Sequence, residues 1–502
     1  MLSQDDIIYF ILTDRFYDGD PGNDFDVDLN NPCAYHGGDF NGIIKKIPYL
    51  KTLGITALWI TPVYENTNLP QKNSWGYHGY WPKDFEKIDP HLYSPVAGIP
   101  EGSKQYLKLL ANALHENGIK LILDMVVNHV GYNHPVFRQE KGTRIKESWF
   151  NRPGLLTDEE VFLAGLPDLD QHNMEVADYF INVTLDWIEE TGIDCIRMDT
   201  VKNVEHIFWY YFKTYVKGKY PDVSLLGEVL VTDIDELSQF QQHFAFDSLF
   251  DFPLQKAIKE VFIEEGSFNI LARPGLSDAE IPGILNKDNV YTNHNRLVTL
   301  MDNHDLPMRF ISGILSRYGN DRQIALAVYK MVITFMMTTR GIPQIFYGNE
   351  FGMEGFADPD NRRDMPWKIL GEDFSPRDEY GFEKEIFLHI KKLIAFRKEN
   401  QALCWGSLVT LYADCFIYAY LREFRGNVVI VAMNNGHDPM AEPLGIDITN
   451  NSNIPQRVRD LLENSLLPDF LGSSGSIRIQ NGQFSIKLDG KTSAIHYLKP
   501  VI

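Results

Sequence analysis

The sequence has few cysteines and no long apolar run. Its 502 residues include four cysteines, Cys33, Cys195, Cys404 and Cys415, which are too few and too scattered for a disulfide framework or a zinc site. No apolar run approaches about 20 residues, so we expect no transmembrane helix. The N-terminal residues also lack a basic stretch followed by an apolar one, as a signal peptide would have. We therefore expect a cytoplasmic protein, or a secreted one if a leader has been removed.

Positive charge is also scarce. Lys and Arg number 47 against 68 Asp and Glu, a net charge of −21 at pH 7, and such an acidic chain is repelled by nucleic acids and anionic membranes. We therefore expect neither as a partner and favour a neutral substrate. Apolar residues, in contrast, make up 44% of the chain, which is enough for the large cores of two or three domains.

Four apolar, strand-like segments carry charged or polar side chains toward their ends. They are residues 121–129 (LILDMVVNH), 192–200 (GIDCIRMDT), 225–229 (LLGEV) and 297–305 (LVTLMDNHD). In the second segment, Arg197 and Asp199 are two residues apart and point to the same side of a strand. One such pair alone would be interpreted as a structural salt bridge. Parallel strands with acids at their carboxyl ends are typical of the active site of a (β/α)8 barrel, so four of them predict this α/β fold.

In this order, the four segments resemble the signature regions of the α-amylase superfamily, glycoside hydrolase family thirteen. The resemblance extends over nearly the whole chain and includes residues 54–62 (GITALWITP), 166–170 (LPDLD) and 341–350 (GIPQIFYGNE). It implies a catalytic (β/α)8 barrel over residues 1–129 and 171–399. It also implies a small domain inserted after the third strand, over residues 130–170.

Two stretches of the chain support this domain division. The excursion over residues 130–170 has about 40 residues, which is too long for an ordinary barrel loop. Beyond residue 399, short alternating runs such as 415–421 and 428–433 are separated by Asn, Gly, Asp and Ser. This pattern predicts an antiparallel β-sandwich over residues 400–502 as the third domain.

The resemblance implies a retaining hydrolase that cleaves α-1,4 bonds of maltodextrins or starch-like oligosaccharides by double displacement. It assigns Asp199 as the nucleophile, Glu228 as the general acid and base, and Asp305 as the third acid. Arg197 favours the ionised form of Asp199, while the apolar flanks of Glu228 favour its protonated form. The side chains that the resemblance places on the substrate are His78, Tyr80, His129, Arg197, Lys202, His304, Asp358 and Arg362.

Other functions stay open at this point. A cyclomaltodextrinase-type hydrolase or an α-glucan transglycosylase would carry the same residues. A relative that binds carbohydrate without catalysis would lack part of the acid trio, but Asp199, Glu228 and Asp305 are all present. In each case the expected partner is an α-glucan oligosaccharide. The sequence does not decide between linear and cyclic substrates, endo and exo action, or a monomer and a homodimer.

A structural Ca²⁺ ion is the cofactor that the resemblance implies, and no organic cofactor is expected. Its ligands would be Asp18, Asp20, Asn23, Asp24, Gly37 and Asp39. From their composition alone, these residues would be interpreted as a solvated polar turn. A second calcium site, at Asn128, Asp168 and Asn203, is left open. Many α-amylases have a histidine where Asn203 stands, but its ligand atom is a backbone carbonyl, which survives the replacement.

Overall fold

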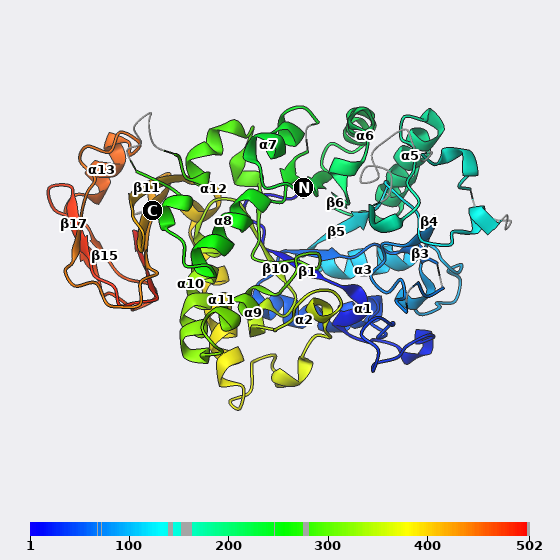
Figure 1. The fold of residues 1–502 in the computed structure, drawn as a ribbon, viewed down its shortest axis with the longest axis horizontal. Coiled ribbons are helices and arrows are strands. Elements are labelled where there is room, and N and C mark those ends of the chain that lie inside the picture. The colour runs from blue at the N-terminus through cyan, green and yellow to red at the C-terminus, as the bar shows by residue number, and fades with distance from the viewer. Residues whose placement is uncertain are drawn as a thin grey trace.

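A parallel sheet of eight strands forms the centre of the molecule (Figure 1). The computed structural model describes residues 1–67, 69–71, 73–138, 144–151, 163–244, 246–274 and 281–498. The strands follow the order β8-β7-β6-β5-β2-β1-β10-β9, and a bridge between Phe250 and Val298 joins the two edges into a barrel. They are β1 (Ile8–Ile11), β2 (Ala57–Ile60), β5 (Lys120–Met125), β6 (Cys195–Met198), β7 (Ser224–Gly227), β8 (Ser248–Leu249), β9 (Val298–Thr299) and β10 (Ile342–Phe346). The predicted (β/α)8 barrel is thereby confirmed.

Helices cover the outside of the barrel and bury one side against it. In α3, for example, Tyr106, Leu107 and Leu110 are buried at helical spacing. Asp or Asn side chains cap the first turns of several helices, as Asp321 does for α10. None of the described helices has the length and apolar character needed to cross a membrane. The helices are α2 (Phe40–Leu53), α3 (Gln105–His115), α5 (Met174–Thr191), α6 (His206–Lys219), α7 (Ile234–Gln242), α8 (Phe252–Phe262), α9 (Phe310–Arg317), α10 (Arg322–Thr338) and α11 (Gly381–Glu399), with a short α1 (Thr13–Phe16) after β1.

The sixth barrel strand is shorter than its sequence suggests. The apolar run at residues 246–252 predicts one continuous strand, but β8 contains two residues. Asp251 accepts a hydrogen bond from the backbone of Leu254 and caps α8, which has Pro253 in its first turn. Helix capping therefore ends the strand before its apolar run is complete.

Two excursions rise beyond the carboxyl ends of the strands. The first is a hairpin of β3 (Tyr64–Asn66) and β4 (Pro82–Ile88), which follows β2 and lies on the side away from the C-terminal strands (Figure 1). The second follows β5 and covers the predicted insertion at residues 130–170. Residues 139–143 and 152–162 of that insertion lie outside the described residues. In the remainder, bridges pair His129 with Asp168 and Phe150 with Leu169.

An antiparallel sheet follows the last barrel helix and the short α12 (Gln401–Trp405). Alternate residues of its central strand β13 face different cores. Val428 and Ile430 join a separate C-terminal core, while Val429 and Val431 pack on the barrel side. This two-sided burial and the smaller strand pairs beyond it fit the predicted β-sandwich. The elements are β11 (Ser407–Ala413), β12 (Ile417–Phe424), β13 (Asn427–Asn434) and β18 (Thr492–Leu498), with β14 (Leu444–Asp447) paired to β17 (Gln483–Ile486), β15 (Leu466–Leu467) paired to β16 (Ile477–Arg478), and helix α13 (Gln456–Leu462).

Arg422 joins this sheet to the barrel. Its side chain is fully buried in β12 and donates hydrogen bonds to the carbonyl oxygens of Thr338 at 2.8 Å, Gly406 at 3.0 Å and Ser407 at 3.2 Å, and also to that of Thr339. The carbonyls of Thr338 and Thr339 lie at the end of α10, where no further turn of the helix supplies a donor. One guanidinium therefore satisfies the ends of two separate segments.

We expect Arg422→Met to destabilise the protein by about 3 kcal/mol, because the carbonyl oxygens of Thr338, Thr339 and Gly406 lose a donor in buried hydrogen bonds. The melting temperature should fall by roughly 3 °C in calorimetry. Arg457→Met is the matched control, since Arg457 is largely exposed and pairs with Glu423, and it should leave the melting temperature within about 1 °C. Equal effects of the two substitutions would contradict this account of the junction.

Candidate active site

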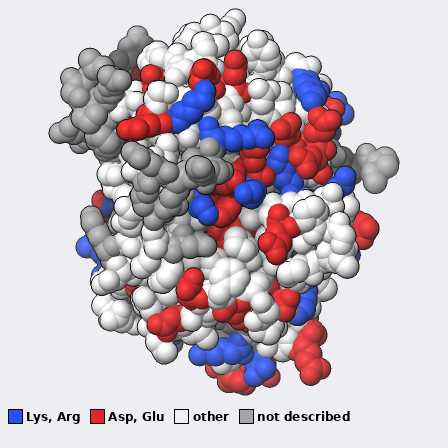
Figure 2. Space-filling model, turned by 90° about the vertical axis from the view of Figure 1, so that its right-hand side faces the viewer, with Lys and Arg blue, Asp and Glu red and all other residues white. Residues whose placement is uncertain are grey.

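A cleft of about 1240 Å³ opens at the carboxyl ends of the barrel strands. Figure 2 views the molecule from the side away from the C-terminal sheet, and acidic and basic side chains gather near the centre of this face. The predicted site residues that line the cleft are His78, Tyr80, His129, Asp199, Lys202, Asn203, Glu228, His304, Asp305, Asp358 and Arg362. Residues that the sequence did not single out, such as Tyr132 and Leu230, also line it. The cleft therefore brings together side chains from six or more separate loops.

The guanidinium of Arg197 connects three carboxylates beneath this cleft. It is fully buried, and its Nη1 lies 2.8 Å from Asp124 Oδ1 and 2.6 Å from Asp199 Oδ1. Its Nη2 lies 2.8 Å from Glu228 Oε1. Asp124 is opposite Arg197 in the β5–β6 register, while Asp199 and Glu228 follow the ends of β6 and β7. Strand register alone therefore places the four groups together.

Burial dominates the electrostatics of this cluster. Burial raises the pKa of Asp199, and the nearby carboxyls of Glu228 and Asp124 raise it further, while Arg197 lowers it. Burial also raises the pKa of Glu228, opposed by Arg197 and reinforced by Asp305. The pKa of Asp124 rises to about 6 for the same reason. Three carboxyls around one cation therefore retain a proton at a pH where isolated carboxyls have lost theirs.

Aromatic rings and histidines form one wall of the cleft. The rings of Tyr80 and His304 are stacked with centroids 5.1 Å apart, and the Tyr80 hydroxyl donates to Asp124 at 2.7 Å. Burial lowers the pKa of His129 to about 4 and those of His78 and His304 well below their usual value, so all three imidazoles are neutral. His129 Nε2 donates to the Tyr80 carbonyl at 3.1 Å. This contact, which the sequence does not reveal, ties His129 to the loop that carries Tyr80.

Asp305 lies between two cationic or donor groups. His304 Nε2 is 3.3 Å from Asp305 Oδ2, and Arg362 Nη2 is 3.4 Å from Asp305 Oδ1. The second terminal nitrogen of Arg362, Nη1, lies 3.3 Å from Asp358 Oδ1. Lys202, in contrast, pairs with Glu236 at 3.3 Å and is half exposed. The structure therefore gathers the predicted Asp305, Asp358 and Arg362 in one group and leaves Lys202 at the rim.

Comparison with known protein families matches residues 10–160 and 155–406 to the α-amylase catalytic domain. The chain belongs to this family. As a member of the α-amylase family, it is a glycoside hydrolase.

Similar proteins share both the sequence and the fold of this α-amylase family chain. A cyclomaltodextrinase of Thermoanaerobacter pseudethanolicus is 32% identical over 457 residues, which cover 86% of this chain and 70% of the relative. The crystal structure of an Anoxybacillus α-amylase is similar with a TM-score of 0.80 and 32% identity, over 100% of this chain and 99% of that one. An α-amylase of Geobacillus thermoleovorans, solved in complex with acarbose, has a TM-score of 0.79 and 30% identity over the full length of both chains.

The N-terminal loop of this family member has the donor chemistry of a calcium site. Asn23 Oδ1 and Asp24 Oδ1 are buried oxygens that lack a hydrogen-bond partner, and burial raises the pKa of Asp39 to about 6. Gly37 has a φ of 88°, and a Cβ there would lie 2.6 Å from Asp24 Oδ1, so glycine permits this approach. Among the described residues, however, no three carboxylates of the loop lie within 4.8 Å of one another. The residues fit a hard cation by chemistry, although the carboxylates are not gathered.

The second predicted site contains further buried oxygens without partners. They are Asn128 Oδ1 and Asp168 Oδ1, together with Glu205 Oε2, which the sequence did not indicate. Burial and the neighbouring Glu205 and Asp170 raise the pKa of Asp168 to about 7, opposed by the amide of Asn151. These oxygens also fit a hard cation. The backbone N–H of Asn203 donates to the Thr200 carbonyl, while the atom that the predicted site would use is the backbone carbonyl oxygen of Asn203.

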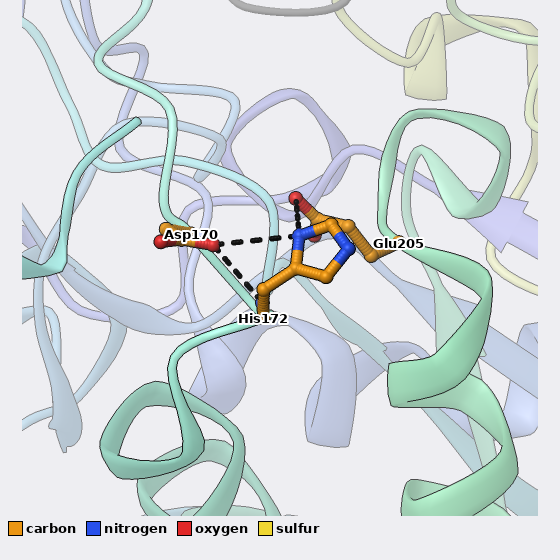
Figure 3. Close-up of side chains that lie close together, drawn as sticks. All are labelled: Asp170, His172 and Glu205. Atoms are coloured by element: carbon orange, nitrogen blue, oxygen red, sulfur yellow. Dashed lines mark hydrogen bonds and ion pairs between the residues drawn. The ribbon is translucent and has the colours of Figure 1, made fainter. Parts of the chain in front are cut away.

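A cluster of Asp170, His172 and Glu205 adjoins this second site (Figure 3). His172 Nδ1 is 3.2 Å from Glu205 Oε1 and 3.6 Å from Asp170 Oδ1. Asp168 and Asp170 are two residues apart in an extended segment, which is a sequence signal that both point to one side. No such signal links His172 to Glu205, because they approach only through the packing of separate segments.

We expect Asp168→Asn to stabilise the protein at pH 8 in the presence of EDTA. The folded-state pKa of Asp168 is raised to about 7, so ionisation costs stability as the pH rises from about 4 to above 7. The substitution removes this cost of about 1 kcal/mol or more and should raise the melting temperature at pH 8 but not at pH 4. Asp178→Asn, at an exposed site on α5, should have no effect at either pH. A lower melting temperature of the Asp168→Asn variant at pH 8 in EDTA would contradict this account.

Proposed function

We propose that this chain is a retaining hydrolase of α-1,4-linked glucans, acting on maltodextrins or starch-like oligosaccharides by double displacement. The observation that supports it most is the contact of one buried guanidinium with both Asp199 and Glu228 in a single cleft. Retention requires two neighbouring carboxyl groups, one as nucleophile and one as proton donor. The shared cation holds the two groups side by side in this way.

Asp199 is the nucleophile in this proposal, and Glu228 is the acid and base. Arg197 donates a hydrogen bond to Asp199 at 2.6 Å and lies 2.8 Å from Glu228. The roles of the two carboxyls in this proposal follow the resemblance of residues 192–200 and 225–229 to the family's signature regions. Glu228 protonates the glycosidic oxygen while Asp199 attacks the anomeric carbon and forms a glycosyl-enzyme. Glu228 then removes a proton from water, which attacks the same carbon and releases Asp199.

The remaining residues would bind and orient the sugar. Asp305 would accept hydrogen bonds from hydroxyl groups of the reacting ring, and His78, His129 and His304, being neutral, would donate to or accept from hydroxyls without adding charge. Tyr80 offers an aromatic face for stacking. Asp358 and Arg362 would bind hydroxyls on the neighbouring sugar, and Lys202 would contact the chain at the rim.

A cyclomaltodextrinase-type activity is the second candidate, favoured by the relative of that name at 32% identity. Transglycosylation differs only in whether water or a sugar accepts the glycosyl group, and a carbohydrate-binding protein without catalysis would not need the acid trio. Product analysis on amylose, cyclodextrins and pullulan separates these activities. Ring opening of cyclodextrin without attack on amylose would favour the cyclomaltodextrinase reading.

The domain division is part of the proposal. We propose a catalytic barrel over residues 1–129 and 171–399, an inserted domain over 130–170, and a C-terminal β-sandwich over 400–502. The separate hydrophobic core of the C-terminal strands supports the last boundary. Cytoplasmic residence and a monomeric or dimeric state remain predictions for cell fractionation and light scattering.

We propose that a structural Ca²⁺ binds at the N-terminal loop through Asp18, Asp20, Asn23, Asp24, Gly37 and Asp39. Such an ion supplies positive charge that neutralises the loop's carboxylates. The loop joins β1 to α2, so the bound ion would stabilise the folded barrel without taking part in catalysis. A second ion at Asn128 and Asp168, with or without the carbonyl of Asn203, is proposed on the same grounds.

We expect Asp199→Asn and Glu228→Gln each to lower kcat for maltooligosaccharides by about 10³-fold or more, because each removes a group that reacts with the substrate. Asp378→Asn, which changes an almost fully exposed carboxylate, is the matched control and should retain wild-type turnover. NMR of the wild-type reaction should show the α anomer first, as retention requires. Wild-type rates in either active-site variant, or a β anomer as first product, would rule out the assignment.

We expect removal of calcium to lower the melting temperature of the wild type. The Asp18→Ala, Asp20→Ala double variant should no longer respond to the chelator at this site, because two of its carboxylate ligands are missing. Calorimetry with EGTA and with added Ca²⁺ measures both effects, and the Asp168→Asn variant serves to separate the second site. An unchanged melting temperature in EGTA would show that no stabilising ion is bound.

A further inference from the structure

Helix α6 presents aromatic side chains to solvent. Of the chain's 24 tyrosines, all of which lie in the described residues, only Tyr210, Tyr211 and Tyr215 are exposed, and all three are on this helix. Their exposed fractions are 59%, 37% and 58%, and Ile207 beside them is 46% exposed. We call Ile207, Tyr210, Tyr211 and Tyr215 the α6 face.

The α6 face is one continuous strip along the helix. Ile207, Tyr211 and Tyr215 follow one another at intervals of four residues, and so do His206 and Tyr210, which places the two rows side by side. The rings of Tyr210 and Tyr211 have centroids 6.2 Å apart. At 1.5 Å per residue, the strip extends for about 12 Å. The opposite side of the helix is buried through Phe208, Trp209, Phe212 and Val216.

This strip begins at the edge of the active-site cleft. His206, the first residue of α6, lines the cleft, and so does Leu230, which is itself exposed. Within the described part of the chain, the hydroxyls of Tyr210, Tyr211 and Tyr215 are not engaged in hydrogen bonds. The strip therefore offers flat apolar faces, free hydroxyl groups and a direct connection to the cleft.

We propose that the α6 face binds a stretch of α-glucan that extends beyond the cleft. This inference rests on the proposed function, because the glucan must first occupy the cleft. Tyrosine rings pack against the apolar faces of sugar rings while their hydroxyls bond to sugar hydroxyls. Tyrosine is also frequent between protein chains. The continuity of the α6 face with the cleft, through His206, favours a polymer that is held in the cleft.

The test compares a polymer with a short substrate. In a Glu228→Gln background, which leaves the polymer intact, the Tyr210→Ala, Tyr211→Ala, Tyr215→Ala triple change should weaken binding to amylopectin by about tenfold in affinity electrophoresis. In the active enzyme, the same change should raise KM for amylopectin severalfold. It should leave kcat/KM for maltotetraose within about twofold, because a short chain is held by the cleft alone.

Two controls separate stacking from other effects of the substitutions. Phe416→Ala removes an aromatic ring of the same exposure, 59%, next to the C-terminal sheet, and should retain amylopectin binding. Tyr→Phe changes at the three positions keep the rings and should restore most of the affinity.

Three outcomes are decisive. Unchanged amylopectin affinity of the triple Ala variant would overturn the proposal. A change from dimer to monomer in light scattering, with weaker binding, would overturn it in favour of an interface between copies. A wild-type protein that binds amylopectin through the α6 face but hydrolyses no glucan would support this surface and contradict the proposed function instead.

Discussion

The neutralisation of one buried charge, that of Arg197, governs the arrangement of the barrel around the cleft. An unpaired guanidinium in the interior would cost several kcal/mol, and this one has no access to solvent. Its partners come from β5, from the end of its own strand β6 and from the end of β7. A shift of one residue between any two of these strands would turn a partner to the other face. The electrostatic requirement and the strand register therefore support each other.

The low polarity around this charge comes from stacked rings. Phe10 and Trp59, from β1 and β2, are stacked with centroids 3.5 Å apart, and Phe10 also contacts His304 edge-on at 5.0 Å. The indole N–H of Trp59 also donates to Asp124 at 3.0 Å, so these rings cover that carboxyl, whose pKa is raised mainly by burial. Aromatic rings therefore lie beneath the carboxyl cluster as well as in the wall of the cleft.

Much of the fold and of the acid cluster could be predicted from the sequence. The four motif-bearing strands are local in sequence, and once they lie in parallel order their ends must meet. Asp199, Glu228 and Asp305 accordingly face one cleft.

Contacts that depend on the path of a loop could not be predicted. The hydrogen bond of His129 to the Tyr80 loop, the pairing of Lys202 with Glu236 and the approach of His172 to Glu205 each join segments whose relative position is set by packing. The end of β8 could not be predicted either, because the helix cap at Asp251 ends the strand within an apolar run.

The two-sided burial of β13 also bears on how such a protein can change during evolution. On the barrel side, Tyr418 of β12 packs against Phe268 and against Phe335 of α10, at 5.6 and 6.4 Å between ring centroids. A barrel that lost these strands would expose those phenylalanines and the buried carbonyls at the end of α10. Exchanging the C-terminal sheet for an unrelated module would therefore require a new outer surface on the helices that it covers.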